Sequence, residues 1–321
     1  MLYPLKLNAA FKDYLWGGTR LRDEFNKQTD IDPVAESWEL SCHHDGQSII
    51  SNGEFSGKTL AQYIETVGKQ VIGTKAPKDK DFPILIKFID AKQSLSVQVH
   101  PDDKYALLHE GESGKTEMWY VMDATPDATL IYGFTHEISH HEFERRIKDN
   151  TLLEVCNQVP IKKGDVFFIE AGTLHAIGAG ALIAEIQQSS NSTYRVYDYG
   201  RVGKDGKLRE LHIEKALAVT KLEPPTRKPE PIAKLTAFAD YDLTILAQCE
   251  LFNVSHFDLH GNCSLNAKKD SFHSILVLDG QIALTYGNDS FTITKGESVF
   301  IPADMGEYIL NGTGEFILTT L

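Results

Sequence analysis

The residues of this sequence best suited to chemistry lie in a short stretch, Leu-Ser-Val-Gln-Val-His-Pro-Asp-Asp at positions 95–103. In an extended strand, side chains two residues apart point the same way, so Ser96, Gln98 and His100 share one face. If that face lines an interior, the imidazole and the amide oxygen can converge on a divalent metal ion. On a strand that faces solvent the same pattern has no such role. Whether a metal site forms therefore depends on the elements that surround this strand.

Strands are expected to dominate the fold. Helical periodicity is limited to residues 58–72 and 139–153, and Ser139 with Glu142 forms a capping box at the start of the second helix. The other regular segments are short, apolar and rich in β-branched and aromatic residues, which is typical of strands. They comprise residues 82–89, 117–122, 128–132, 166–169, 181–187, 272–278 and 291–293.

A proline-rich segment divides the chain. Four prolines fall within residues 223–231, and such a segment can continue neither a helix nor a central strand. A faint repeat relates its two sides, because Lys-Gly-Asp-Val-Phe-Phe-Ile at 163–169 is similar to Lys-Gly-Glu-Ser-Val-Phe-Ile at 295–301. Residues 117–123 are likewise similar to 273–279. A Gly-Asp or Gly-Glu turn, an apolar strand and a polar residue on the next strand form the pattern of a cupin jelly roll.

The predicted fold is therefore all-β dominated, with two cupin-type jelly-roll barrels and a few helices inserted in the N-terminal part. We expect residues 1–222 to form the catalytic, metal-binding barrel and residues 223–232 to form a linker. Residues 233–321 should form a second, cupin-like barrel without metal. His273 and Glu307 lie near two ligand positions of that barrel, but no Gln-x-His pair precedes them.

Two further residues complete a candidate metal site in the first barrel. Glu117 begins a strong strand and His175 lies at the polar end of the Gly-Asp strand pair, where a cupin carries its later ligands. With Gln98 and His100 they supply two imidazoles, a carboxylate and a neutral oxygen, a set that suits zinc and leaves room for a substrate oxygen. Such a site keeps a net positive charge and can polarise a sugar carbonyl or hydroxyl.

Other motifs are less informative. The sequence His-Glu-Ile-Ser-His at 136–140 matches the metalloprotease pattern, but the capping box starts the helix after Ser139 and leaves His136 in the preceding turn. The Gly-Ala-Gly-Ala sequence at 178–181 lacks the third glycine and the helix of a dinucleotide-binding loop. The pair His43-His44 is expected at the surface rather than at a metal.

Composition restricts the partners. A formal net charge of -13 disfavours nucleic acid and anionic membranes, so an anionic ligand requires a local cluster of cations. The sequence has neither a long apolar run nor the pattern of a signal peptide, and we expect a cytoplasmic protein without membrane contact. The four cysteines are dispersed, which predicts reduced packing residues rather than disulfides or a cysteine-built zinc site.

A family resemblance covers most of the chain. It is carried by Tyr-Leu-Trp-Gly-Gly-Thr-Arg at 14–20, Ala-Glu-Ser-Trp at 35–38, Leu-Ser-Val-Gln-Val-His-Pro-Asp-Asp at 95–103, and by residues 82–88, 114–119, 171–176 and 185–195. In these segments the chain closely resembles the type I mannose-6-phosphate isomerases of the short bacterial form. The resemblance implies two cupin barrels and zinc bound by Gln98, His100, Glu117 and His175. It also implies interconversion of mannose 6-phosphate and fructose 6-phosphate by proton transfer through an enediol.

The same resemblance suggests roles for further residues. Arg195 matches an active-site arginine, and a guanidinium suits an oxyanion or a phosphate. Lys115 precedes Glu117 by two residues and should project to the same side. Lys87 and Ser96 match pocket-lining positions and are candidates for phosphate or sugar contacts. An isolated Lys or Arg is otherwise a solvated charge.

The proton acceptor is less clearly indicated. Many relatives have Ser-Asp-x-Thr where this chain has Ser-Asn-Ser-Thr at 190–193. Asn191 cannot accept a proton as a carboxylate can, so we expect it to contact substrate. Glu185 matches an acidic residue of the family and is the expected base, with a metal-bound water as the alternative.

Three functions remain in competition at this point. The first is a zinc-dependent sugar-phosphate isomerase, and the second is a non-catalytic cupin that binds a sugar phosphate as a sensor or accessory protein, which Asn191 favours. The third is an iron-dependent cupin oxygenase, against which Gln98 argues as a fourth ligand. The oligomeric state and the range of sugar phosphates accepted stay open.

Overall fold

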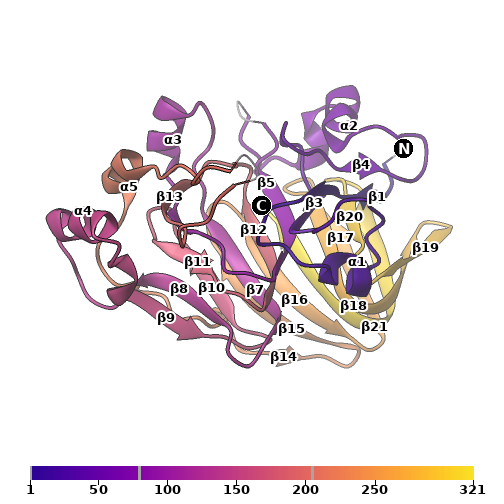
Figure 1. The fold of residues 1–321 in the computed structure, drawn as a ribbon. Coiled ribbons are helices and arrows are strands. Elements are labelled where there is room, and N and C mark those ends of the chain that lie inside the picture. The colour runs from indigo at the N-terminus through magenta and orange to yellow at the C-terminus, as the bar shows by residue number, and fades with distance from the viewer. Residues whose placement is uncertain (1, 79–80, 204–205) are drawn as a thin grey trace.

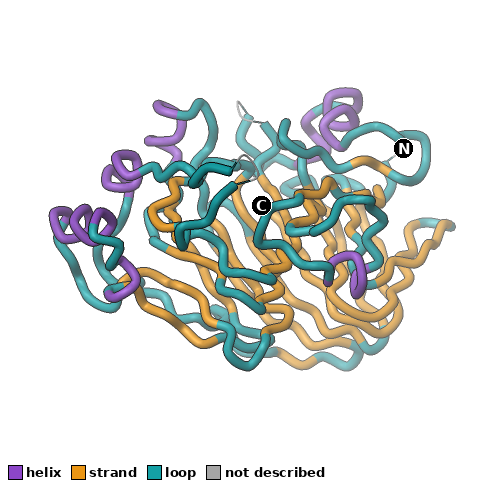
Figure 2. The backbone as a smooth tube through the Cα atoms, viewed as in Figure 1, coloured by secondary structure: helices purple, strands orange, loops and turns teal. Residues whose placement is uncertain are grey.

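The computed structural model describes residues 2–78, 81–203 and 206–321, and most of this chain is packed β-sheet (Figure 1). Strands fill the centre of the molecule, whereas the helices lie at its margins (Figure 2). Every predicted strand segment overlaps an observed strand, so the all-β dominated class is confirmed. The helices are α1 (Arg20–Phe25), α2 (Leu60–Val67), α3 (Asp103–His109), α4 (His140–Lys148) and α5 (Ile213–Val219), with single 3-10 turns η1 (Lys69–Ile72) and η2 (Leu152–Glu154).

Two sheets form the first barrel. One has the strand order β10-β7-β12-β5-β3-β2 and the other has the order β13-β6-β11-β8-β9. Apolar side chains of both sheets meet between them in a single buried cluster. The strands of the first sheet are β2 (Ala10–Lys12), β3 (Glu36–Leu40), β5 (Ile84–Ala91), β7 (Glu117–Ala124), β10 (Val166–Ile169) and β12 (Ala181–Gln188), and those of the second are β6 (Val97–Val99), β8 (Thr129–Phe134), β9 (Cys156–Pro160), β11 (His175–Ile177) and β13 (Tyr194–Tyr197).

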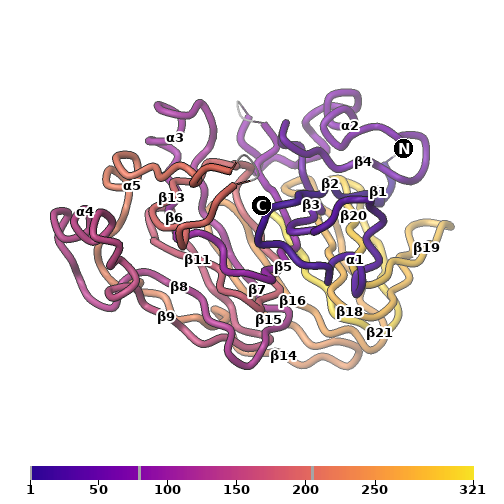
Figure 3. The backbone as a smooth tube through the Cα atoms, in the orientation of Figure 1, coloured from indigo at the N-terminus to yellow at the C-terminus, as the bar shows by residue number. Residues whose placement is uncertain are grey.

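The second barrel is built from the C-terminal strands and from two strands of the N-terminal segment. β1 (Leu5–Asn8) pairs with β20 (Ser298–Ile301) on one side and with β4 (Ile49–Ile50) on the other. The two ends of the chain are thus interleaved in one sheet, as the adjacent labels of β1 and β20 in Figure 3 show. The remaining strands are β14 (Thr236–Ala237), β15 (Tyr241–Gln248), β16 (Asn253–Leu259), β17 (Asn262–Ala267), β18 (His273–Tyr286), β19 (Asp289–Thr294) and β21 (Gly306–Thr320).

The sheet that contains β5, β7 and β12 is buried on both faces. Along β5, Ile86 and Phe88 pack in the same cluster as Phe252, Phe272 and other residues of the second barrel. The alternate residue Ile89 packs instead inside the first barrel. Side chains alternate between the faces of a strand, so Lys87, between Ile86 and Phe88, points to the interior of the first barrel.

The helices depart in part from the sequence expectation. The segment 58–72 is divided at Gly68, whose φ of 109° ends α2 in a conformation that favours glycine. In α4 the Ser139 hydroxyl accepts the Glu142 N–H, but the Glu142 carboxylate accepts from Arg146, so only half of the expected capping box forms. The reciprocal capping box lies in α2, between Thr59 and Gln62. The helices α1, α3 and α5 were not predicted, because six or seven residues are too few to show a helical period.

The proline-rich segment is irregular and packs against the first barrel. Residues 223–232 form neither helix nor strand, and Arg227 lies 3.9 Å above the Phe168 ring of the first barrel.

α4 begins at His140 and leaves His136 outside, so the metalloprotease interpretation is wrong. All four cysteines are free thiols, as predicted. Within the described residues, no helix is long and apolar enough to cross a membrane.

A polar contact also joins the two barrels. Lys163, in the turn before β10, forms an ion pair of 2.8 Å with Glu315 of β21. The second carboxylate oxygen of Glu315 lies 3.5 Å from Nε2 of His256, whose ring stacks on Tyr120 of β7. The nearby imidazole of His256 and the ammonium of Lys163 together lower the pKa of Glu315 to about 2.

We expect Glu315→Gln to lower the free energy of unfolding at pH 7 by about 1–2 kcal/mol, as for a partly buried ion pair. Because the pKa of Glu315 is depressed in the folded state, the unfolded state binds more protons between the ordinary glutamate pKa and about 2. The contribution is therefore complete above the ordinary pKa and is lost as the pH falls toward 2. Urea unfolding of the wild type and the variant at pH 7, 5 and 4 measures this, and the difference should shrink at pH 4.

The matched control is Glu144→Gln, which removes an exposed ion pair with Lys148 on α4 and should change stability little. A difference between wild type and Glu315→Gln that stays constant from pH 7 to pH 4 would contradict the expectation.

Candidate metal centre and active site

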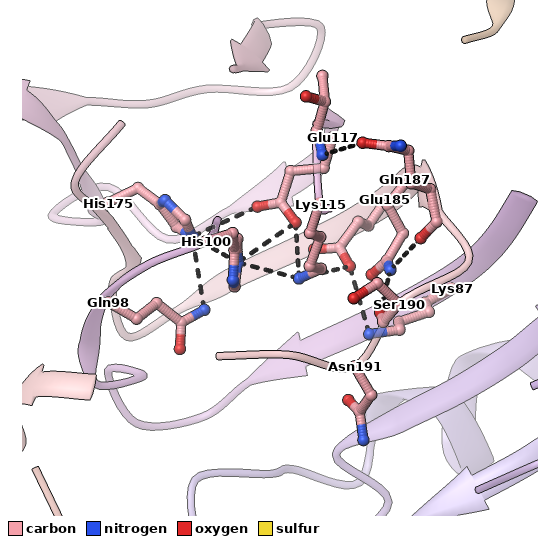
Figure 4. Close-up of polar contacts among 12 residues, drawn as sticks. Lys87, Gln98, His100, Lys115, Glu117, His175, Glu185, Gln187, Ser190 and Asn191 are labelled. Atoms are coloured by element: carbon pink, nitrogen blue, oxygen red, sulfur yellow. Dashed lines mark hydrogen bonds and ion pairs between the residues drawn. The ribbon is translucent and has the colours of Figure 1, made fainter. Parts of the chain in front are cut away.

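The four predicted ligands come from opposite walls of the first barrel. Gln98 lies on β6, His100 directly after β6, and His175 begins β11, all in one sheet. Glu117 begins β7 in the facing sheet. β6 and β11 are neighbours, and their register pairs Gln98 with His175. The fold thus brings together side chains that are far apart in sequence (Figure 4).

Three of these side chains form a compact, fully buried cluster. The Nε2 atoms of His100 and His175 are 3.1 Å apart. The Glu117 carboxylate lies 3.7 Å from Nε2 of His100 and 3.4 Å from Nε2 of His175. One Glu117 oxygen, Oε1, has no hydrogen-bond partner among the described residues, although the side chain is wholly buried. An unpartnered buried carboxylate oxygen is costly unless a cation binds it.

The tautomers of the two histidines point to the same conclusion. Nδ1 of His100 lies 2.9 Å from the carbonyl oxygen of Ser192, and Nδ1 of His175 lies 2.8 Å from that of Thr173. A carbonyl only accepts, so each Nδ1 carries the hydrogen and each Nε2 presents its lone pair to the other. Backbone carbonyls commonly orient metal-binding histidines in this way.

Burial keeps both rings neutral, as metal ligands must be. Burial, assisted by the ammonium of Lys115, lowers the pKa of His100 well below its ordinary value. Burial lowers the pKa of His175 to about 4. The Lys115 ammonium lies 3.1 Å from Nε2 of His100 and offsets part of the repulsion among the two facing lone pairs and the carboxylate. A divalent cation would be bound by all three groups. The donor set therefore fits a metal ion.

Gln98 borders this cluster. Its Nε2 lies 3.5 Å from Nε2 of His175, and its Oε1 lies 3.4 Å from the Ser96 hydroxyl. A 180° rotation of the side-chain amide exchanges its oxygen and nitrogen, which would present the oxygen to the cluster. Gln98 as a fourth ligand stays a prediction.

Charges of alternating sign cross the neighbouring strands. Lys115 lies 2.7 Å from Glu117 and 3.9 Å from Glu185. Lys87 lies 3.4 Å from Glu185 and 3.6 Å from Glu36. Glu185 is directly opposite Lys87 in the β5–β12 register, so the sheet itself positions this pair. All five side chains are buried, which such groups tolerate only when paired.

These pairings fix the charge states. Burial would raise the pKa of Glu185, but Lys115 and Lys87 outweigh it and the pKa is lowered. Burial would lower the pKa of Lys87, but Glu36 and Glu185 outweigh it and the pKa is raised. Burial and the nearby Glu185 raise the pKa of Glu117. In the protein alone, Glu185 is thus the more firmly ionised of the two carboxylates nearest Lys115.

A cavity of about 300 Å³ opens beside this network. Seven of the predicted site residues line it, whereas His100, Glu117 and His175 lie fully buried behind Gln98 and Lys115. Trp16, Trp119 and Leu95 supply apolar wall. The predicted residues in the lining are Lys87, Ser96, Gln98, Lys115, Glu185, Asn191 and Arg195.

Arginines gather in another part of the lining. Arg195 donates from Nε to the Ser96 hydroxyl at 3.3 Å and from Nη1 to the Glu210 carbonyl at 3.0 Å. Arg209 also lines the cavity, and its Nε donates to Asp198 at 2.6 Å. Arg201 donates to the same carboxylate at 2.6 Å. Burial and the neighbouring Arg209 lower the pKa of Arg195, so this cluster is short of negative charge.

Asn191 makes its own contacts at the cavity edge. Its side-chain amide donates to Asp45 at 2.8 Å, and its backbone N–H donates to Glu112 at 3.1 Å. Asp45 follows the pair His43-His44, of which His44 is exposed as expected and His43 is buried. The amide of Asn191 is thus already engaged with a protein carboxylate.

The corresponding residues of the second barrel do not meet. Nδ1 of His273 lies 2.7 Å from the Tyr308 hydroxyl, and Glu307 is exposed. The interior of that barrel is an apolar cluster that includes the stacked rings of Phe257 and Phe316.

Two charged residues of the cavity lining, Glu36 and Arg209, were missed from the sequence. Glu36 accepts from the Trp38 indole at 2.7 Å, and both alternate with Ser37 along β3, so strand periodicity could have placed Glu36 inward. Arg209 lies in an irregular segment between β13 and α5, where periodicity gives no direction.

Comparisons with known proteins identify the family of the chain. Residues 4–127 match the family model "Phosphomannose isomerase type I, catalytic domain", and residues 242–321 match "Mannose-6-phosphate isomerase, cupin domain". Two Bacillus subtilis proteins, the mannose-6-phosphate isomerase ManA and the probable mannose-6-phosphate isomerase GmuF, are each 38% identical over 99% of both chains. The crystal structure of the mannose 6-phosphate isomerase from Bacillus subtilis superposes with a TM-score of 0.91 at 35% identity over 99% of both chains.

A more distant structure extends the likeness of fold alone. A point mutant of phosphomannose isomerase from Salmonella typhimurium has a TM-score of 0.79 at 17% identity, over 98% of both chains. The full-length identity to curated enzymes, together with the two family models, establishes the relationship on which the resemblance was based. The chain is an enzyme and belongs to the type I mannose-6-phosphate isomerase family.

Proposed function

We propose that the chain interconverts mannose 6-phosphate and fructose 6-phosphate through an enediol, with one zinc ion held by Gln98, His100, Glu117 and His175. The observation that carries this proposal is the convergence of two Nε2 lone pairs and an unpartnered carboxylate oxygen beside the cavity. The names of the relatives supply the substrate. When bound, the metal would polarise a substrate oxygen as a Lewis acid.

The proton transfer between C1 and C2 requires a base and a donor to the developing oxyanion. Glu185 is the proposed base, because Lys87 and Lys115 keep it ionised and the Trp119 indole donates to its Oε2 at 2.9 Å. Lys115 is the proposed donor, since its ammonium lies between the metal ligands and Glu185. Burial of both groups strengthens these interactions by excluding water.

The phosphate would bind at the arginine cluster. The carboxylates and ammonium groups near the metal site alternate. Among the described residues, Arg201 and Arg209 share the carboxylate of Asp198, and Arg195 beside them donates to a hydroxyl and a carbonyl rather than to a carboxylate. A dianion is therefore attracted to the arginines, and guanidinium groups bind phosphate with two parallel hydrogen bonds. Arg195 lies nearest the sugar, where Ser96 is its partner, and would contact either the phosphate or the enediolate. Lys87 and Ser96 would face the sugar hydroxyls.

The sensor alternative rested on Asn191. In the structure Asn191 donates to Asp45, and the ionised Glu185 lines the same cavity. Catalysis thus does not need a carboxylate at position 191, and the isomerase is the better supported proposal. We assign Asn191 to the cavity edge, where it would contact substrate through its amide oxygen.

We expect His100→Ala to abolish both zinc binding and turnover, with a loss of more than about 100-fold in metal affinity, since even residues that only orient a ligand contribute 10–100-fold. Metal analysis of the purified variant and a coupled assay with mannose 6-phosphate measure the two effects. His141→Ala, at an exposed position of α4 away from the metal centre, serves as the control and should keep both. Full turnover by a metal-free His100→Ala protein would refute the proposal.

We further expect Arg209→Gln to raise KM for mannose 6-phosphate by about 10–100-fold with a small change in kcat. This range corresponds to the loss of one charged hydrogen-bonding group. The matched control is Arg201→Gln, because Arg201 binds the same Asp198 but is not among the residues that line the cavity. Steady-state kinetics and competition by inorganic phosphate measure the effect. If Arg201→Gln raises KM as much as Arg209→Gln, a specific contact between Arg209 and the phosphate is refuted.

A further inference from the structure

The two metal-binding histidines are oriented in different ways. Nδ1 of His175 donates to the carbonyl of Thr173, two residues earlier in its own segment. Nδ1 of His100 donates instead to the carbonyl of Ser192, which lies in the irregular segment 189–193 between β12 and β13. The orientation of His100 thus depends on how that distant segment is held, whereas the orientation of His175 does not.

The carboxylate of Glu112 holds three successive residues of the segment from outside, in addition to the bond from the Asn191 side chain to Asp45. Oε2 of Glu112 accepts hydrogen bonds from the Ser190 hydroxyl at 3.0 Å, the Asn191 N–H at 3.1 Å and the Ser192 hydroxyl at 3.4 Å. Nε2 of His43 lies 3.9 Å from the same oxygen. Three successive residues that end at Ser192 therefore share one acceptor.

The segment is also held from inside. The buried amide of Gln187 donates to the Ser190 carbonyl at 2.7 Å (Figure 4). Ser190 itself is fully buried. Gln187 fixes the beginning of the segment, and Glu112 is the acceptor that reaches its end, where the Ser192 carbonyl meets His100.

We propose that Glu112 is a positioning residue of the metal centre, which acts through residues 190–192 on the ring of His100. Without this carboxylate the N–H of Asn191 and two hydroxyls lose their shared acceptor. Among the described residues, the Ser192 carbonyl is then held only through Ser190, which the Ser192 N–H contacts, and through the bond from Asn191 to Asp45, so it becomes more mobile. Nδ1–H of His100 then lacks a fixed acceptor, so the tautomer with a free Nε2 is no longer selected. The inference rests on the proposed metal centre but not on the substrate.

The test compares Glu112→Ala and Glu112→Gln with the wild-type chain in zinc titrations against a competing chelator. We expect Glu112→Ala to raise the Kd for zinc by about 10-fold, the lower end of the range for groups that orient ligand histidines. Glu112→Gln keeps an acceptor oxygen without the charge and should show a smaller rise. Because Glu112 is partly exposed, both variants should fold.

Glu110→Ala is the matched control. Glu110 lies two residues away and accepts hydrogen bonds from the Tyr194 hydroxyl and from Lys215, each at 2.7 Å. Neither of these partners belongs to residues 190–192. Its removal should leave the Kd for zinc within about twofold, which is well below the range for ligand-orienting groups. An equal rise in Glu110→Ala would overturn the proposal, because it would indicate general loosening.

A second readout separates the two rings. In zinc-loaded protein labelled with ¹⁵N-histidine, Glu112→Ala should shift the Nδ1–H resonance of His100 and speed its exchange with water, while the Nδ1–H resonance of His175 stays in place. Unchanged resonances with an unchanged Kd, or equal changes at both rings, would overturn the inference. These measurements need no turnover of mannose 6-phosphate. Their outcome therefore tests the role of Glu112 independently of the proposed isomerase activity.

Discussion

Burial of one sheet on both faces is the constraint on which this molecule depends. The faces of β5, β7 and β12 differ because side chains alternate along each strand. One face carries Ile86 and Phe88 into the core shared with the second barrel, and the other carries Lys87 and Glu185 into the cavity. Packing against the second barrel thus holds the sheet from which the charged groups project. This gives a structural role to a barrel whose own interior is apolar.

The charged face tolerates burial only because its members alternate in sign. Glu36, Lys87, Glu185, Lys115 and Glu117 follow one another across adjacent strands, each next to an opposite charge. Such an arrangement adds little net stability, since desolvation offsets the attraction. It does hold five ionisable groups in fixed positions, which a site for proton transfer requires. The arginine cluster lacks this balance, and that excess of positive charge distinguishes it within a chain of net charge -13.

The sequence predicted those features that follow from strand periodicity. Gln98 and His100 share a strand face, and Glu117 and His175 lie at strand starts, so the cluster around them could be expected before the structure was known. Periodicity gives no information in loops. Arg209 and Glu112 lie in irregular segments, and their partners are 11 and about 80 residues away in sequence. The short helices α1, α3 and α5 form because tertiary contacts support them, a cause that no local pattern records.

The pairing of β1 with β20 has a consequence for synthesis on the ribosome. Residues 5–7 find their strand partners only at residues 298–300, which are made long after them. The outward face of the β5–β7–β12 sheet likewise waits for Phe252 and Phe272 before it is covered. Until those later segments are made, the nascent chain therefore exposes an unpaired edge and an apolar surface, the two features that favour aggregation and recruit chaperones.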